Sequence, residues 1–285
     1  MKKTLLAFLA CLFAAVFVLP LTVSADMGPK PSVTVAVEGA DGRDFYGTLL
    51  SERDSTGPQS AYDPEIHGPS YQYPEGYGDE EVFRQFLAYE DPDGYYFLQI
   101  CWPCEGTDTF AWTYYPPDTF KVLLYFPDTG EFVSSGVCER YAFDSYFTAS
   151  LTGEGLAVRS SYEYRWEIFS LLVRILLTIA AELLVAILFR FRGKRTYRTL
   201  IWVNVVTQVL LNVSLNLINF YSGQMAFTFF YVLLELVVFA VEGGVLALTL
   251  GEKQKVRKLW LYAFIANACS FALGLALARW LPGIF

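Results

Sequence analysis

The stretch LIWVNVVTQVLLNVSLNLINF, residues 200–220, decides the fold of the second half of the chain. It is long and apolar enough to cross about 30 Å of membrane hydrocarbon as a helix. Its amide residues recur at every fourth position, which places them along one face of that helix: Asn204, Gln208, Asn212 and Asn216. Amides that face lipid lack hydrogen-bond partners, so we expect this face to be turned into a helix bundle.

Three other segments share this length and apolar character, so the C-terminal half is predicted to be an α-helical bundle of four membrane spans. The spans are expected at residues 167–189, 200–220, 226–250 and 259–280. The connection between the second and third spans carries no charge. Basic residues follow the first span at Arg190, Arg192, Lys194, Arg195 and Arg198, and the third span at Lys253, Lys255, Arg257 and Lys258. Because short loops rich in Lys and Arg stay in the cytoplasm, the N-terminal domain, residues 221–225 and the C-terminus are predicted to lie outside.

The N-terminus has the features of a secretory signal peptide. Lys2 and Lys3 precede an apolar run at residues 5–18, and the sequence Val-Ser-Ala follows at residues 23–25. Residues 1–25 are therefore expected to direct export and to be removed. Together with the spans, this predicts a multi-pass protein of the bacterial plasma membrane, with the lipid bilayer as its surroundings.

Composition narrows the class of protein further. The chain has 285 residues, of which 54% are hydrophobic, and a formal net charge of −8, which excludes a disordered protein and one that coats nucleic acid. Residues 26–165 contain 24 Asp and Glu against 8 Lys and Arg, whereas residues 166–285 contain 5 against 11. The charge pattern indicates an exported acidic domain at residues 26–160 and a membrane domain at residues 161–285.

Short runs of alternating apolar and polar residues indicate that the exported domain is an all-β sandwich, because a period of two places alternate side chains on one face of a sheet. The strands are expected at residues 32–38, 45–50, 95–102, 109–115, 120–126 and 131–135. Turn signals such as Asp91-Pro92-Asp93-Gly94 separate them. Residues 79–89 predict a short helix with Phe83, Phe86 and Leu87 on one face.

The strand spacing and the sequence Asp93-Gly94-Tyr95-Tyr96-Phe97-Leu98 resemble transthyretin-like and carboxypeptidase-regulatory-type sandwiches of bacterial surfaces. This resemblance implies binding or structural spacing rather than catalysis. A loop rich in Pro, Gly and Tyr at residues 51–79 contains Tyr62, Tyr71, Tyr73 and Tyr77. Tyrosine offers a large amphipathic contact area, so the loop is a candidate for binding an extracellular ligand. The alternative is that these rings fill a loop-rich fold.

Three cysteines lie in the exported domain: Cys101, Cys104 and Cys138. The first two have the C-x-x-C spacing of redox proteins, but a redox motif opens a helix, and the residues that follow here read as a turn and a strand. In an oxidising compartment a structural disulfide is favoured, either Cys101–Cys104 or one of these two with Cys138. Three thiolates can also hold a metal, but His67, the single histidine, lies far away in the tyrosine-rich loop.

Polar residues inside the predicted spans form the candidate functional site. In the first span Arg174, Thr178 and Glu182 lie four residues apart, and in the third span Glu235 and Glu242 lie seven apart, so each set shares a helix face. Glu182, Gln208 and Glu242 each lie about 12 Å from the cytoplasmic end of their span, so they share one level. The whole cluster consists of Arg174, Glu182, Asn204, Thr207, Gln208, Asn212, Glu235 and Glu242.

Three interpretations of this cluster are open. In the first, Arg174 neutralises one glutamate and the amides cross-link helices, although one arginine leaves two of the three glutamates to be neutralised by protons, a cation or water. In the second, the glutamates and amides form a cation or proton site or a substrate path, since oxygen-rich ligand sets suit hard cations. In the third, paired carboxylates serve an intramembrane enzyme, although the spans contain no histidine, zinc motif or Ser/Lys pair. The sequence identifies no catalytic residue, metal or cofactor.

The fourth span carries small residues at four-residue spacing, which permits close helix packing within the bundle or in a homo-oligomer: Ala266, Ser270, Gly274 and Ala278.

The chain combines a signal peptide, an acidic β-domain and polar spans, and the polar spans contain Glu182, Asn204-Val205-Val206-Thr207-Gln208, Asn212, Glu235 and Glu242. This combination resembles a group of multi-pass bacterial membrane proteins that carry no assigned activity. The resemblance implies this architecture and no mechanism. The sequence favours surface binding or sensing by the exported domain, coupled to the bundle; the alternative is transport of a cation, proton or small solute.

Overall fold

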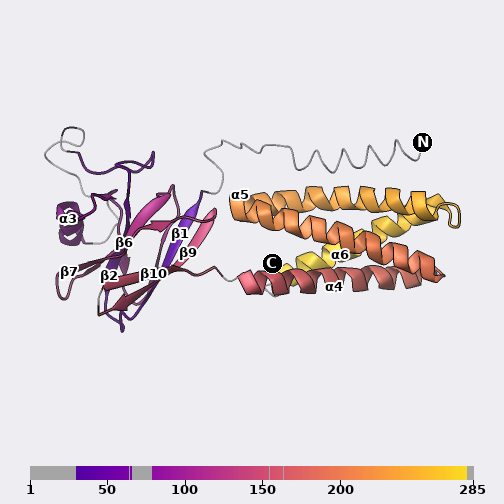
Figure 1. Cartoon of the computed structure of the whole chain (residues 1–285), viewed down its shortest axis with the longest axis horizontal. Helices are drawn as coiled ribbons and strands as arrows, with labels where there is room; N and C mark the ends of the chain where they lie inside the picture. Colours follow the sequence, from indigo (N-terminus) through magenta and orange to yellow (C-terminus); the bar gives the residue numbers. More distant parts are fainter. Residues whose placement is uncertain (1–29, 64, 66–78, 154, 163, 281–285) are drawn as a thin grey trace. The chain divides into compact units, whose positions relative to one another are not determined.

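The computed structural model describes residues 30–63, 65, 79–153, 155–162 and 164–280, and Figure 1 shows its elements. It has a β-rich unit, Pro29–Tyr162, and a helical unit that contains Glu163–Phe285. A β-rich region followed by long helices is what the sequence predicts. The predicted signal peptide lies outside the described residues.

Two sheets form the described part of the β-rich unit. The first has the strand order β10 (Gly155–Ser160), β9 (Asp144–Thr152), β1 (Ser32–Glu38) and β5 (Thr109–Trp112), in which β1 runs parallel to β9 and antiparallel to β5. The second has the order β3 (Tyr96–Phe97), β2 (Phe45–Ser51), β6 (Thr119–Phe126) and β7 (Glu131–Ser134). Two short strands join it, β4 (Trp102–Cys104) on β2 and β8 (Cys138–Glu139) on β6.

The two sheets share one apolar core, as expected for a sandwich. Val33, Val35 and Val37 of β1 are all buried in it, which confirms the predicted alternation. Their partners come from both sheets and include Phe120, Val122, Leu124, Phe147 and Ala149. Alternate side chains of β1 therefore hold the first sheet against the second.

The second sheet is buried on both faces because the helix α3 (Glu80–Ala88) covers the face that the first sheet does not. Phe83 and Phe86 of α3 pack with Leu50, Leu123 and Tyr125 of the sheet. The helix begins where the Asp79 carboxylate accepts a hydrogen bond of 2.8 Å from the backbone N–H of Glu81. The predicted helix and its apolar face are thus confirmed.

Two parts of the β-prediction differ from the structure. Residues 95–102 form two short strands rather than one, because Gln99 between them has a positive φ of 62° and its side chain donates to the Ser60 carbonyl. Strands β8, β9 and β10 are additional to the prediction. In β9 the apolar Phe147, Ala149 and Leu151 alternate with Ser and Thr, so the period of two is present in the sequence and was missed.

The predicted turn at residues 91–94 is present and is fixed by a buried ion pair. Gly94 has φ 79°, and its N–H donates to the Asp91 carbonyl at 2.9 Å. The Asp91 carboxylate accepts from the Lys121 ammonium on β6 at 2.9 Å and from the Asp93 N–H at 3.0 Å. The turn is therefore tied to the central strand of the second sheet.

The helical unit consists of α4 (Tyr164–Leu188), α5 (Lys194–Leu250) and α6 (Val256–Trp280). Gly223 interrupts α5 with non-helical angles, φ 78° and ψ 176°, and Figure 1 shows α5 as two legs that run back along each other from one end. Two helices of the described chain, Ile168–Leu188 and Lys194–Leu250, are long and apolar enough to cross a membrane. The sequence predicts four spans; the second and third lie in the two legs of α5, and the fourth corresponds to α6, which is not among these two.

Two apolar clusters hold the bundle together. One joins Val185 of α4, Leu246 of α5 and Tyr262 of α6, and the other joins Leu211 and Leu234 from the two legs of α5. In the small-residue stripe of α6, Ala266 and Ser270 are buried inside this chain. The side chain of Ala278 lies outside the description.

Candidate functional site

Three glutamates are buried together in the helical unit. Glu182 on α4 is 0% exposed, and Glu235 and Glu242 on the second leg of α5 are 9% and 1% exposed. The Glu182 carboxyl group lies within electrostatic range of the other two. Of the predicted amide stripe, Asn204, Gln208 and Asn212 are buried and Asn216 is half-buried.

Glu242 has a hydrogen-bond donor on each carboxyl oxygen. The Thr207 hydroxyl donates to Oε1 at 2.6 Å, and the Asn267 Nδ2 donates to Oε2 at 2.7 Å. The first contact brings the two legs of α5 to one level, as the depth argument predicts. Asn267 was not identified from the sequence, because the fourth span was assigned to helix packing alone. Asn267 could have been noticed as the single amide of that span.

Glu182 differs from Glu242 in having no such donors. Neither of its carboxyl oxygens has a hydrogen bond of ordinary length within the described chain, and neither does the Asn204 Nδ2; the Asn204 side chain faces the Glu182 carboxyl group in a longer contact. The Tyr262 hydroxyl donates to the backbone carbonyl of Glu182 at 3.3 Å, not to its carboxyl group. A buried polar group without a partner costs about 1 to 3 kcal/mol, and more when charged, so this position is one that packing alone does not explain.

The three glutamates form no ion pair with any described lysine or arginine. The Arg174 guanidinium instead donates to the Ser170 hydroxyl at 3.1 Å. The first interpretation assumed that Arg174 neutralises one glutamate, and the structure does not form that pair. No described lysine or arginine therefore neutralises these carboxyl groups, and only Glu242 has a hydrogen-bond donor on each oxygen.

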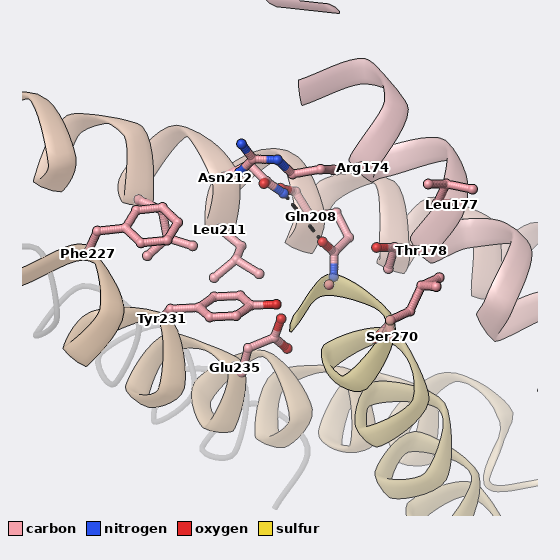
Figure 2. Close-up of a pocket in the computed structure, with 13 residues that line it drawn as sticks. Arg174, Leu177, Thr178, Gln208, Leu211, Asn212, Phe227, Tyr231, Glu235 and Ser270 are labelled. Atoms are coloured by element: carbon pink, nitrogen blue, oxygen red, sulfur yellow. Dashed lines mark hydrogen bonds between the residues drawn. The ribbon is translucent and has the colours of Figure 1, made fainter. Parts of the chain in front are cut away.

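A cavity of about 30 Å³ lies beside Glu235 and is lined from α4, both legs of α5 and α6. Figure 2 shows the Tyr231 hydroxyl and the Glu235 carboxyl group pointing toward each other, with Gln208 facing them. The Asn212 Nδ2 donates to the backbone carbonyl of Gln208 at 2.8 Å and to its Oε1 at 3.4 Å. The Gln208 Nε2 and the Glu235 Oε2 have no partner among the described residues. Tyr231 lines this cavity and was not singled out from the sequence, whereas Ser270, which also lines it, was assigned only to the small-residue stripe of the fourth span.

The geometry offers no preformed metal centre in the described part of the chain, where no group of three His, Cys, Asp or Glu side chains is close enough to hold a metal ion. Both oxygens of Glu242 are already used by donors. The arrangement is suited to holding protons and water at Glu182 and Glu235.

The cysteines of the β-rich unit do not form the predicted Cys101–Cys104 bridge. Cys101 is buried in the core under α3, whereas Cys104 is buried in the core between the sheets, so their sulfur atoms lie on opposite faces of the second sheet. Burial raises the pKa of both thiols to about 12. Cys138 is a thiol that donates to the Gly136 carbonyl at 3.7 Å. Buried thiols of this kind are neither redox nucleophiles nor metal ligands.

Residues 64 and 66–78 of the tyrosine-rich loop lie outside the described residues, and these include His67, Tyr71, Tyr73 and Tyr77. The described β-rich unit has a different surface cavity, of about 350 Å³, whose lining includes Arg53, Tyr115 and Arg140.

No family model, curated protein or solved structure matches this chain. Its function is therefore argued from its own residues.

Proposed function

We propose that the protein is an integral protein of the bacterial plasma membrane with four spans, and that its β-rich unit and C-terminus lie outside. The 57 residues of α5 would measure about 85 Å as one straight helix, more than twice the thickness of the hydrocarbon. The break at Gly223 lies in the uncharged segment 221–225, where a turn at the outer surface is expected. The helices also expose large apolar residues such as Leu176, Leu188 and Phe229, as a lipid-facing surface requires.

We infer further that the bundle transports a proton or small cation through the buried glutamates. The observation that carries this function is Glu182: its side chain is fully buried, and both carboxyl oxygens lack hydrogen bonds of ordinary length within the described chain. An ionisable group inside a membrane bundle is costly, and the longer contact of Glu182 with the neutral Asn204 side chain compensates this cost less than the two hydrogen bonds of Glu242 do, which favours use over packing. The carboxyl groups of Glu235 and Glu242 lie within electrostatic range of Glu182 and provide two further sites that can bind a proton or cation.

Flux measurements on the purified full-length protein in liposomes test this function. With a pH-sensitive dye inside and an imposed membrane potential, we expect proton entry that falls at least tenfold in Glu182→Gln, which keeps the shape of the side chain and removes its titration. Glu252→Gln is the control, because Glu252 is an exposed glutamate in the turn after α5. Wild-type flux in Glu182→Gln, Glu235→Gln and Glu242→Gln alike would contradict the proposal.

A second candidate function is ligand binding by the exported unit. The supporting observation is the 350 Å³ cavity, whose volume falls in the range of small-molecule sites. Arg53, Arg140, Glu52 and Asp118 line it beside the ring of Tyr115 and Pro116. Charged groups of both signs next to an aromatic ring suit a small polar ligand, such as a sugar or an amino acid.

A thermal-shift screen of the full-length protein in detergent against sugars, amino acids and small carboxylates tests this second function. We expect a ligand that raises the unfolding temperature and loses at least tenfold in affinity in Arg53→Ala. The matched control is Arg84→Ala on α3, where the arginine is exposed and pairs with Glu80. If no compound in these classes shifts the transition, the cavity is not such a site.

A further inference from the structure

The cavity beside Glu235 presents two complementary polar atoms to the same small space. The Gln208 Nε2 is a hydrogen-bond donor, and the Glu235 Oε2 is an acceptor when the group is ionised. Both atoms are buried, both residues line the cavity, and neither atom has a partner in the described chain. Figure 2 shows the two side chains facing each other across it.

The size of the cavity selects what can satisfy these two atoms. Its volume is about 30 Å³, and a cavity needs roughly 10 to 15 Å³ to hold one water molecule. Water accepts from an N–H and donates to a carboxylate at the same time, so one molecule can serve both atoms. A sugar, an amino acid or a hydrated ion is too large for this space.

The chemistry of the lining disfavours a bare metal cation. The atom that Gln208 directs at the cavity is an N–H donor, which repels a cation, and its Oε1 already accepts from Asn212. The guanidinium of Arg174 lines the same cavity and adds a fixed positive charge. A proton delivered through water instead binds directly to a carboxylate and neutralises it.

We propose that this cavity binds one water molecule between Gln208 and Glu235, and that this water makes the proton, rather than a metal cation, the species exchanged at the glutamates. The inference rests on the proposed transport function and narrows its substrate. In the step, an O–H bond of a protonated water breaks and an O–H bond forms on the Glu235 carboxylate. The water is left neutral, and Glu235 becomes the uncharged acid that passes the proton on to the glutamates within electrostatic range.

Hydroxyl-radical footprinting of the full-length protein in liposomes tests for the water. Radicals generated from bound water label the side chains beside it, so we expect labelling of Leu211 and Tyr231, which line the cavity. Leu211 is buried, so its labelling reports internal water. Gln208→Met keeps the length of the side chain and removes the donor, and it should reduce both labels at least fivefold. Asn219→Met is the matched control, because Asn219 is an exposed amide on the same leg of α5.

Flux in the same liposomes then identifies the species that is exchanged. We expect wild-type proton entry to be unchanged when Na⁺ and K⁺ are replaced by a large organic cation, and to fall at least tenfold in Glu235→Gln. Unlabelled Leu211 and Tyr231 in the wild type would show a dry cavity and overturn the inference while leaving transport intact. Flux that requires Na⁺ or K⁺ would overturn the choice of the proton. Labelling without any flux would support the water site and overturn the proposed function instead.

Discussion

Glu182 and Glu242 are the same residue type at the same level of the bundle, yet their surroundings differ. Two donors meet the Glu242 carboxyl group, and none in the described chain lies at ordinary hydrogen-bond length from that of Glu182. Removing an unpartnered polar group is close to neutral or stabilising, whereas removing an acceptor leaves its donors unsatisfied. Substitutions of Glu182 should therefore affect function without lowering stability, whereas substitutions of Glu242 should lower stability.

Glu242→Leu is expected to lower the stability of the protein by about 1 to 2 kcal/mol, because one buried N–H of Asn267 loses its acceptor, whereas the Thr207 hydroxyl can still donate to the Val203 carbonyl at 3.0 Å. Glu182→Leu is expected to be neutral or stabilising, although it abolishes flux. Thermal unfolding of both variants in one detergent gives the comparison. Equal losses of stability would mean that Glu182 has structural partners equivalent to those of Glu242.

The thiols of Cys101 and Cys104 should resist alkylation in the folded protein. With a pKa of about 12, roughly one thiol in ten thousand is ionised at pH 8, and both side chains are also buried. We expect iodoacetamide to leave them unmodified under native conditions and to modify both in denaturant without added reductant. Mass spectrometry reads the outcome. A requirement for reductant before labelling would show that one of the predicted disulfides forms after all.

Strand β2 requires glycine at position 47, because the aromatic ring of Phe110 lies directly over it. A Cβ atom at Gly47 would approach Phe110 to 2.4 Å, and the Phe110 ring is stacked on Trp102 at 5.9 Å between centroids. Gly47→Ala is therefore expected to destabilise the β-rich unit by about 1 to 3 kcal/mol through overpacking. Gly136→Ala is the control, because nothing lies within 4 Å of a Cβ at that position.

Denaturant unfolding of the full-length protein, followed by tryptophan emission, measures the change. The double variant Gly47→Ala with Phe110→Leu should recover part of the loss, because the smaller side chain leaves room for the methyl group. A loss of the same size in Gly136→Ala would mean that the ring of Phe110 is not the cause, because the change in chain entropy from Gly to Ala stabilises the folded state.

Elements with a strong local period could be predicted from the sequence. The alternation in β1 and the apolar face of α3 each follow from a few neighbouring residues, and both have the predicted bounds to within one or two residues. Strand β9 was missed although Phe147, Ala149 and Leu151 alternate with Ser and Thr, because this local signal consists of only three apolar residues. Its parallel pairing with β1, more than a hundred residues away, depends on tertiary contacts that no local pattern contains.

The candidate site was predictable where spacing along a single helix defines it. The four-residue period of Asn204, Gln208 and Asn212 placed these amides on one face, and all three are buried. The choice of partners was not predictable, because it depends on the rotation of each helix about its axis. Asn267 binds Glu242 and Arg174 pairs with none of the three glutamates, and both results follow from packing between helices rather than from the sequence of either one.

At the scale of the whole molecule, the charges of the connections and the break in α5 favour one arrangement across the membrane. The basic residues 190–198 and 253–258 lie at the ends of helices that also expose apolar side chains, and Gly223 breaks α5 between those two connections. Basic connections on one side and an uncharged break on the other are the pattern that the proposed four crossings would give. A single crossing by α5 would instead leave more than half of its apolar length in water.

Fusions of the full chain truncated at chosen points test this arrangement in bacterial cells. An alkaline phosphatase reporter, which is active only outside the membrane, is expected to be active when joined after residue 160 or residue 222 and inactive after residue 192 or residue 254. A fluorescent protein that folds in the cytoplasm should give the opposite pattern. Replacing the five basic residues at 190–198 with glutamine should weaken the pattern at residue 192, because these charges hold that connection inside. Phosphatase activity at residue 254 equal to that at residue 222 would mean that the second leg of α5 does not cross, and Glu235 and Glu242 would then lie outside the bilayer.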